Sequence, residues 1–464
     1  LNHQFTMPIY DSPNSLSNIL HCRRQKLAKL IDFPVVIWAG NTTPRNFAAN
    51  HFPFRASSHF LYFAGIPLKN AVIRLEEEKL ELYIDNITSD VSLWCGETYQ
   101  REEIADFIGA DAAFPLTELE THLFGAATIA VQDPATWTQQ SQLLGRWILP
   151  LSPPQGIDLE LARAIVTLRL IHDDEAIREL VKAADISVKA HLAGMQTVKS
   201  ASTEAEVRAA MESIIIANNM TTAYNSIVTV HGEVLHNNKY HNPLHSGDLL
   251  LADVGAETEM GWAGDITRTF PVSGKFSSTQ KDIYDVVLAA HDACIAKIRP
   301  GVEYRDIHML ACLTLTEGLV SVGILQGDPA NLVERNVHSV FFPHGIGHLL
   351  GLDVHDMEDL GDLAGYKEGR NRSDLFGLSY LRLNRSLQSN MLITIEPGFY
   401  QVPAILNPAR SKYKYLINWE KLELFADVRS IRIEDEVLVT NVGSKVLSAD
   451  LPTDTSTIEE IIIS

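Results

Sequence analysis

The sequence has few cysteines, no long hydrophobic run and too little positive charge to balance its acidic residues. Its four cysteines, Cys22, Cys95, Cys294 and Cys312, form no C-x-x-C pair, which argues against a disulfide framework and against a thiolate zinc site. No stretch approaches the roughly 18 uninterrupted apolar residues of a membrane-spanning helix. The formal net charge of −20 repels phosphate backbones and anionic membranes, so we expect neither nucleic acid nor membrane as a partner.

The composition is typical of a globular protein, with 46% hydrophobic and 21% charged residues. At 464 residues the chain is too long for one ordinary core, so we expect two domains. Residues 1–17 lack the basic-then-apolar order of a secretory signal. Together with the scattered cysteines, this predicts a cytoplasmic protein.

The first part of the chain alternates between strand and helix patterns. Apolar runs at 35–40 and 60–65, each closed by glycine, predict buried strands, and 71–84 predicts a hairpin. Residues 98–108 have helical spacing, and 127–131 again have the pattern of a strand. This alternation predicts a small α/β domain.

A proline-rich stretch marks the domain boundary. Residues 150–156 break regular structure, a helix is predicted over 158–170, and the segment 172–175, with acidic residues at 173–175, opens a long amphipathic helix. We therefore predict an N-terminal domain over residues 1–170 and a second domain over 171–464. Helices alternate with strand hairpins in the second domain, which predicts an α+β fold on a largely antiparallel sheet.

Two aspartates in the second domain are candidate metal ligands. An apolar strand ends at Asp253, a second run carries Asp265, and a turn near Met260 and Gly261 would bring both carboxylates onto one face. Two like charges held so close need a cation, and a divalent metal ion would supply it. The alternative is that Asp253 caps a strand end and Asp265 is a turn residue.

Three histidines follow among glycines and aliphatic residues. His344, His348 and His355 lie where neutral imidazoles can serve as ligands. Gly345 and Gly347 make a regular helix unfavourable, so this is not the zinc-binding helix of zincins. For any one of these histidines taken alone, the pattern favours a hydrogen-bonded role in a core or loop over metal binding.

Two glutamates complete the set of candidate ligands. Glu396 ends an apolar run that proline closes, and Glu434 lies within a strand predicted over 430–440, on the same face as Arg432 and Glu436. Glu434 alone would fit the charged outer face of a half-exposed strand. As a set, four carboxylates and one imidazole suit two divalent ions.

With these residues in place, the second domain resembles the pita-bread metallopeptidases, and most closely the branch of Xaa-Pro aminopeptidases and prolidases. The resemblance rests on six stretches in the family's order, at residues 234–236, 251–255, 264–270, 344–355, 395–398 and 432–435. The first domain is similar to the N-terminal domain of that branch through Phe54-Arg55 and residues 60–65. Methionine aminopeptidases generally lack this domain.

The resemblance implies a ligand set and the residues around it. The implied ligands of two divalent ions are Asp253, Asp265, His348, Glu396 and Glu434. The family implies manganese, although cobalt, zinc and iron suit the same ligands. The implied surroundings of the substrate are His236, His344 and His355, with Arg432 beside the last ligand, Arg382 where prolidases bind a dipeptide carboxylate, and Trp94 where relatives reach into a neighbouring subunit. We accordingly expect a homodimer or larger homo-oligomer.

The implied chemistry is hydrolysis of short proline-containing peptides by an activated water. Glu396 is the candidate for handling the proton of that water, and His236 and His355 are candidates for hydrogen bonds to the oxyanion. Arg382 and the long segment 357–378 favour an Xaa-Pro dipeptidase, whereas the N-terminal domain and the sequence around Asp265 favour an Xaa-Pro aminopeptidase. We expect the aminopeptidase. A non-catalytic binding module and a metal-free hydrolase of the creatinase type are further alternatives, and the complete ligand set argues against both.

One departure from the family concerns spacing. The interval from Asp253 to Asp265 is one residue longer than usual. An extra residue inside a strand would turn one carboxylate away from the other, whereas one at the turn would leave the pairing intact. We expect it in the turn, at residues 257–261.

Overall fold

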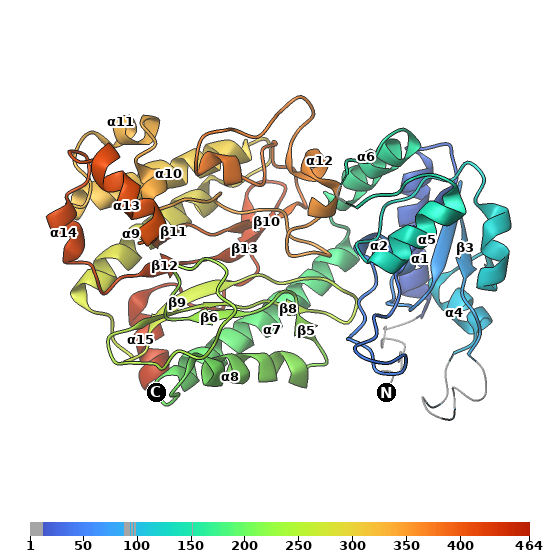
Figure 1. Ribbon diagram of the computed structural model, residues 1–464, viewed down its shortest axis with the longest axis horizontal. Coiled ribbons are helices and arrows are strands. Elements are labelled where there is room, and N and C mark those ends of the chain that lie inside the picture. Colours follow the sequence, from blue (N-terminus) through green and yellow to red (C-terminus); the bar gives the residue numbers. More distant parts are fainter. Residues whose placement is uncertain (1–12, 88–92, 94–95, 97–98, 151) are drawn as a thin grey trace. The chain divides into compact units, whose positions relative to one another are not determined.

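The computed structural model describes residues 13–87, 93, 96, 99–150 and 152–464, and the chain divides into two compact units (Figure 1). The first unit extends to Leu170 and also contains Glu259–Gly261 and Met357–Ala364, two segments that the sequence analysis assigned to the second domain. The second unit contains the remainder, from Ile171 onward.

The first unit contains a four-stranded sheet with the order β1-β2-β3-β4. Its strands are β1 (Val35–Trp38), β2 (Val72–Glu76), β3 (Lys79–Tyr83) and β4 (Ala112–Phe114). The first three are antiparallel, and β4 pairs parallel to β3. Its helices are α1 (Pro13–Ala28), α2 (Ser58–Ala64), α4 (Arg101–Ile108), η1 (Leu116–His122), α5 (Pro134–Leu144) and α6 (Ile157–Arg169). The predicted hairpin and the helices before and after the proline-rich break are confirmed.

Two strand predictions in this unit were wrong. The run at 60–65 belongs to the helix α2, which Ser57 caps at its start and which Gly65 ends with a φ of 73°. All seven residues of α2 are buried, and a short apolar run cannot distinguish a buried helix from a buried strand. At 127–131 only a single bridge forms, between Ala127 and Val35, because the side chain of Gln140 hydrogen-bonds the backbone there in place of a neighbouring strand.

A chain of hydrogen bonds fastens the segment Met357–Ala364 within the first unit. The Arg169 guanidinium donates to Nδ1 of the buried His59 at 2.9 Å, so that Nε2 carries the imidazole proton. That nitrogen lies 2.9 Å from Asp359 Oδ2. Burial alone would raise the pKa of Asp359, but His59 and Arg169 hold it below its ordinary value.

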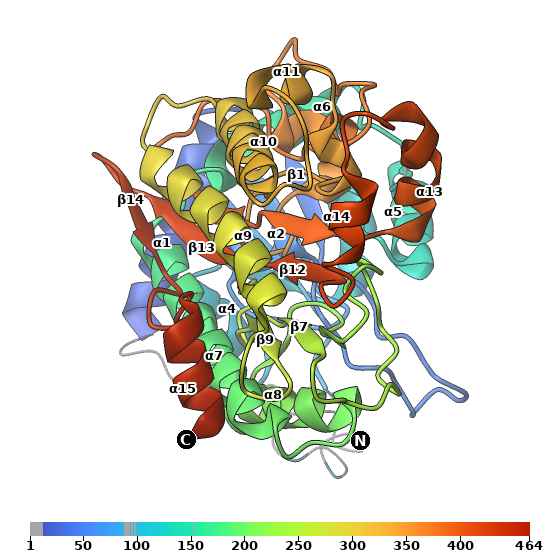
Figure 2. The same ribbon diagram turned by 90° about the vertical axis from the view of Figure 1, so that its left-hand side faces the viewer.

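The second unit has strands between two sets of helices (Figures 1 and 2). On one side lie α7 (Asp174–Val198), α8 (Glu204–Ala217) and α15 (Thr455–Ile463), which pack against the strands formed by residues 221–271. On the other side lie α9 (Ser278–Lys297) and α10 (Tyr304–Ser321). The helix α7 begins as its sequence predicts, because the Asp173 side chain accepts a hydrogen bond from the Ala176 N–H.

All named strands of this unit pair antiparallel, which confirms the predicted α+β class. The first half contains β5 (Thr221–Thr222), β6 (Ile227–Thr229), β7 (Leu249–Asp253), β8 (Ala256–Glu257) and β9 (Thr267–Pro271). The second half contains β10 (Leu392–Ile395), β11 (Gly398–Tyr400), β12 (Ser430–Arg432), β13 (Asp435–Val439) and β14 (Ser444–Val446). An isolated β-bridge between Thr267 and Glu434 is one of the contacts that join the two halves.

Short helices occupy the connections of the later part of the chain. They are α11 (Pro329–Glu334), η2 (His338–Val340), η3 (Glu358–Leu360), α12 (Asp362–Gly365), η4 (Leu378–Tyr380), α13 (Pro403–Lys412) and α14 (Trp419–Glu423). Among the described residues, none of the helices has both the length and the hydropathy that crossing a bilayer requires.

The contact between His59 and Asp359 yields a stability prediction. Asp359→Asn removes the carboxylate that accepts the His59 Nε2–H bond, and we expect the unfolding free energy to fall by about 1–2 kcal/mol at pH 7. Because the folded-state pKa is depressed, the contribution is present above the ordinary pKa and is lost as pH falls below about 4. Thermal unfolding would show it, with Asp106→Asn, at an exposed position of α4 in the same unit, as the control. Equal melting temperatures for the two variants would contradict the prediction.

Candidate metal centre

The strands β7 and β9 present Asp253 and Asp265 on one hairpin. Asp253 pairs with Thr267, and the same register continues to the pair of Glu257 and Ala263. The additional residue therefore lies in the turn beyond these pairs, as expected, because the residue pairing keeps the same register on both sides of the interval between them. The hairpin is so tight here that a Cβ on Gly255 would lie 1.8 Å from the Gly264 carbonyl oxygen, so glycine is required.

A tyrosine that the sequence analysis missed joins the two aspartates. The Tyr224 hydroxyl lies 2.6 Å from Asp253 Oδ1 and 2.7 Å from Asp265 Oδ1. A hydroxyl has one proton and can donate to only one of these oxygens, so the other contact needs a further positive charge or proton nearby. No spacing rule pointed to Tyr224, which precedes β6 and is remote from both aspartates in sequence.

The tautomer of His348 leaves one nitrogen available as a ligand. Nδ1 lies 2.9 Å from the Leu349 carbonyl oxygen, which can only accept, so Nδ1 carries the proton. Nε2 faces Asp265 Oδ2 at 3.2 Å and Glu396 Oε1 at 3.8 Å. Burial opposes a charge on this ring, but the two carboxylates raise the pKa of His348, and a metal ion would take the place of the proton on Nε2. A ring nitrogen facing two carboxylates is the arrangement that a bound cation stabilises.

A close backbone approach brings His348 to Glu396. Gly347 has a φ of 153°, and a Cβ there would lie 2.3 Å from the Thr394 carbonyl oxygen. The Thr394 hydroxyl accepts from the His348 N–H at 3.2 Å, and Glu396 follows two residues later at the end of β10. Gly347, one of the two glycines that make a zincin helix unfavourable, thus allows the two backbone segments to approach closely.

The structure corrects the prediction of one continuous strand over 430–440. It places Glu434 in a break between β12 and β13, where the Thr267 hydroxyl donates to Glu434 Oε2 at 2.7 Å. Glu434 and Glu436 are both buried, and Glu436 accepts the Asp265 N–H at 2.6 Å. The alternative prediction that Glu434 lies on the charged outer face of a half-exposed strand is therefore wrong, because the bridge to Thr267 covers this segment.

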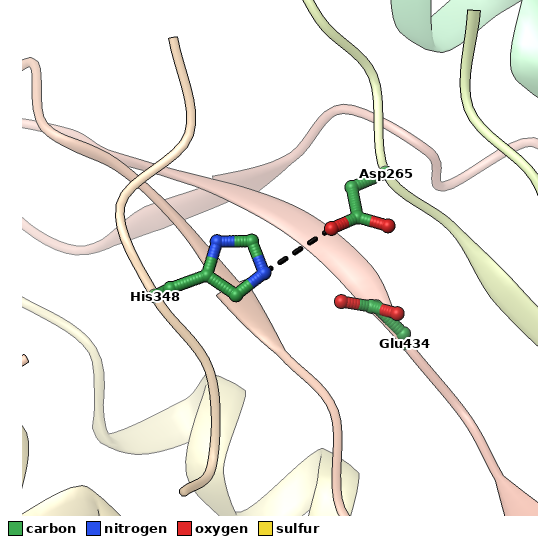
Figure 3. A group of neighbouring side chains, drawn as sticks. All are labelled: Asp265, His348 and Glu434. Carbon is green, nitrogen blue, oxygen red and sulfur yellow. Dashed lines mark ion pairs between the residues drawn. The ribbon is translucent and has the colours of Figure 1, made fainter. Parts of the chain in front are cut away.

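The three ligand atoms that lie closest together come from Asp265, His348 and Glu434, all within 4.8 Å of one another. Figure 3 shows these side chains pointing toward a common centre from separate segments. Burial raises the pKa of Asp253 to about 6 and that of Glu396 to about 7, and it raises the pKa of Glu434 well above its ordinary value. Carboxylates that resist ionisation together, next to an imidazole lone pair, fit divalent cations.

Arg432 supplies the permanent positive charge of the centre. Its guanidinium donates to Asp253 Oδ2 at 2.5 Å, to the Tyr400 hydroxyl at 3.1 Å and to the Thr267 hydroxyl at 3.1 Å. Burial opposes the charge, but Tyr400 and Asp253 raise the pKa of Arg432 well above its ordinary value. One guanidinium cannot balance four carboxylates, which leaves negative charge for metal ions.

Three histidines surround the ligands, and burial favours the uncharged form of two of them, His344 and His236. His344 Nδ1 donates to the Gly345 carbonyl at 2.8 Å, so its Nε2 accepts from the Tyr400 hydroxyl at 2.9 Å. Burial, with Arg432, lowers the pKa of His344 to about 3, and burial likewise lowers that of His236. The ring of His355 stands edge-on to that of His348, with centroids 4.3 Å apart.

One cavity of about 560 Å³ in the second unit collects almost every predicted site residue. Its lining includes Asp253, Asp265, His348, Glu396 and Glu434 together with His236, His344, His355, Arg382 and Arg432. Trp94 lies outside the described residues. Residues drawn from most of the length of the second unit thus meet around one space.

The fold and the cavity define a metal-dependent hydrolase site. Residues 178–441 match metallopeptidase family M24, and residues 20–131 match the N-terminal domain of aminopeptidase P. The chain therefore belongs to metallopeptidase family M24, with its pita-bread fold.

Relatives match along most of their length. A probable Xaa-Pro aminopeptidase of Sordaria macrospora is 32% identical over 88% of this chain and 87% of its own, and one of Pyrenophora tritici-repentis is 33% identical over 89% and 88%. The solved structure of Pseudomonas aeruginosa aminopeptidase PepP covers 96% of this chain and 98% of its own, with a TM-score of 0.79 and 25% identity. E. coli aminopeptidase P with the inhibitor Pro-Leu has the same coverage, with a TM-score of 0.78 and 26% identity.

The bridging contacts of Tyr224 yield a prediction about metal affinity. Tyr224→Phe removes the hydroxyl that orients Asp253 and Asp265, and we expect divalent-metal affinity to fall by about 10-fold to 100-fold. Calorimetric titration of the metal-free protein with Mn²⁺ measures this directly. Tyr413→Phe, whose hydroxyl bonds the Arg335 carbonyl, is the matched control. Wild-type affinity in Tyr224→Phe would show that the hydroxyl does not orient the ligands.

Proposed function

We propose that the cavity binds two divalent metal ions and hydrolyses the peptide bond between an N-terminal residue and a following proline. The observation that carries this is the meeting of all five candidate ligands with His236, His344 and His355 in one cavity. The named relatives support this, because they are described as probable Xaa-Pro aminopeptidases and match over most of the chain. The protein is accordingly a metallo-exopeptidase of the Xaa-Pro aminopeptidase type.

The five candidate ligands would bind the two ions together. Asp253, Asp265, His348, Glu396 and Glu434 would bind them, and we propose Mn²⁺, although the same oxygen-rich set accepts Co²⁺, Zn²⁺ or Fe²⁺. Two bound ions supply a nucleophile from water near neutral pH and polarise the scissile carbonyl. A side-chain nucleophile is not needed.

Glu396 is placed to move protons. Its Oε1 lies 3.8 Å from His348 Nε2, and its Oε2 lies 3.8 Å from His344 Nδ1, so its carboxylate faces the centre of the cavity. We propose that it takes a proton from the attacking water and returns it to the leaving nitrogen. The imino nitrogen of proline must gain this proton before the product leaves.

Two histidines of the cavity are candidates for contacts with the carbonyl oxygen. His355 lies beside His348, and His236 lines the same cavity, so both can donate a hydrogen bond to the oxyanion. An Xaa-Pro bond is a tertiary amide without an N–H, which prevents strand-like pairing of the substrate backbone. Recognition of the substrate therefore falls to the shape and side chains of the cavity.

Two alternatives without metal chemistry are less consistent with the site. A binding module or a creatinase-type hydrolase has no need for four buried or largely buried carboxylates around one imidazole lone pair. We further propose a cytoplasmic enzyme that works as a homodimer or larger homo-oligomer, for which the support is the sequence pattern alone.

The ligand assignment predicts loss of metal and activity together. Asp265→Asn and Glu434→Gln each remove a charged ligand while preserving shape, so we expect bound metal to fall and hydrolysis to decrease by at least about 100-fold. Metal analysis and initial rates with an Xaa-Pro peptide measure both effects. Asp282→Asn, on the exposed face of α9, is the control. Full activity in metal-free protein would overturn the proposal.

Arg382 makes the Xaa-Pro dipeptidase the specific competing function, because it lines the cavity where it could meet a dipeptide carboxylate. We expect a tripeptide such as Ala-Pro-Gly to be cleaved after alanine at least as efficiently as Ala-Pro. Values of kcat/KM for the two peptides decide the question. Cleavage of the dipeptide alone would establish the dipeptidase.

A further inference from the structure

Two large aromatic side chains line the cavity while remaining in contact with solvent. Phe376 is 42% exposed and Tyr380 is 55% exposed, and both line the cavity that holds the carboxylates. Their rings stand edge to face, with centroids 6.1 Å apart. We call this pair the aromatic rim. Exposed apolar surface that continues into a cavity is characteristic of a binding site.

The aromatic rim is held by an ordered turn. The Asn336 side chain donates to the Phe376 carbonyl at 2.9 Å, and the Tyr380 N–H donates to the Gly377 carbonyl at 3.1 Å. Gly377 has a φ of 84°, which permits the turn, and a Cβ there would lie 3.0 Å from Ser339 Cβ. A fixed backbone presents the rings at little ordering cost, which favours binding.

The lining of the cavity changes character between its buried part and this rim. The candidate ligands Asp253, Asp265 and Glu434 are 2–8% exposed. The half-buried Val402 and Ile405, beside the start of α13, add further apolar surface to the lining. The reacting bond therefore belongs at the charged part, while the rim is suited to an apolar group.

The direction of the substrate follows from exopeptidase cleavage, and this step rests on the proposed function. The N-terminal residue and the scissile bond must reach the buried ligands, whereas the peptide after proline must extend toward solvent. The exposed members of the lining are His236, Phe376 and Tyr380, so the extending chain passes these side chains, and the two aromatic rings are the large apolar surfaces among them. The first side chain beyond proline is that of the third residue.

We propose that the aromatic rim binds the side chain of the third residue of the substrate and selects an apolar or aromatic one. The preferred substrates are then peptides of three or more residues with the pattern Xaa-Pro-apolar. A dipeptide has no third residue and loses this contact. Edge-to-face and stacked contacts with the two rings favour a phenylalanine side chain in particular.

The test compares Ala-Pro-Phe, Ala-Pro-Leu and Ala-Pro-Gly with the full chain loaded with Mn²⁺. We expect kcat/KM for Ala-Pro-Phe to exceed that for Ala-Pro-Gly by about tenfold, mainly through KM, because the contact is made in both the ground state and the transition state. Phe376→Ala and Tyr380→Ala should each reduce this ratio, and the double variant should bring it near one.

Controls separate recognition from folding and assembly. Tyr415→Ala removes an aromatic side chain that is 79% exposed and does not line the cavity, so it should keep the wild-type ratio. Thermal unfolding of the double variant should match that of the wild type, and light scattering should give the same mass for both. A lower mass with an unchanged ratio would identify the rim as a subunit interface and overturn the proposal.

The remaining outcomes distinguish the rim from the proposed function. Equal kcat/KM values for Ala-Pro-Phe and Ala-Pro-Gly in the wild type would overturn the role of the rim and leave the aminopeptidase intact. A ratio of kcat/KM for Ala-Pro-Phe to that for Ala-Pro-Gly that is unchanged in the double variant would likewise overturn the role of the rim and leave the aminopeptidase intact. Cleavage of Ala-Pro but of no tripeptide would overturn it in favour of a dipeptidase. Failure to cleave any of these peptides would overturn the proposed function itself.

Discussion

Four carboxylates that meet in a low-dielectric cavity are the constraint on which the second unit depends. Like charges at such distances cannot all ionise unless positive charge lies among them, and Arg432 supplies only one permanent cation. Metal ions resolve the remaining repulsion, which links the chemistry to the stability of the centre. The contacts around the carboxylates fix oxygen positions before any ion binds, since Tyr224 and Thr267 bond directly to candidate ligands. This preorganisation lowers the cost of assembling a site from distant segments.

The ligands are brought together by backbone contacts that only particular residues allow. Gly255 and Gly264 pass so closely that a side chain on Gly255 would clash with the opposite strand, and Gly347 approaches Thr394 in the same way. The isolated β-bridge between Thr267 and Glu434, together with the hydrogen bonds of Arg432 to Asp253 and Thr267, then connects the two halves of the unit. Glycines, which have no functional side chain, therefore determine where the reactive side chains lie.

Much of this arrangement could be predicted from the sequence, because strand ends and turns have local signatures. The hairpin of Asp253 and Asp265, and the turn position of its additional residue, follow from periodicity and register. The bridging role of Tyr224 could not be predicted, because it depends on the tertiary position of one hydroxyl group. The break at Glu434 and the helical state of 60–65 were missed for a related reason: a fully buried segment loses the alternation that reports its structure.

The two parts of the cavity are built on different kinds of structure, and this separates catalysis from recognition. Most candidate ligands lie on strands or directly beside them, where backbone pairing fixes each position and a shift of one residue would reverse a side chain. Phe376 and Tyr380 lie instead on a turn that is held by a few hydrogen bonds. Substitutions in a turn can change which side chains meet the substrate without altering the strands. The cavity can thus keep one hydrolytic centre while the preference for the residue after proline is set independently.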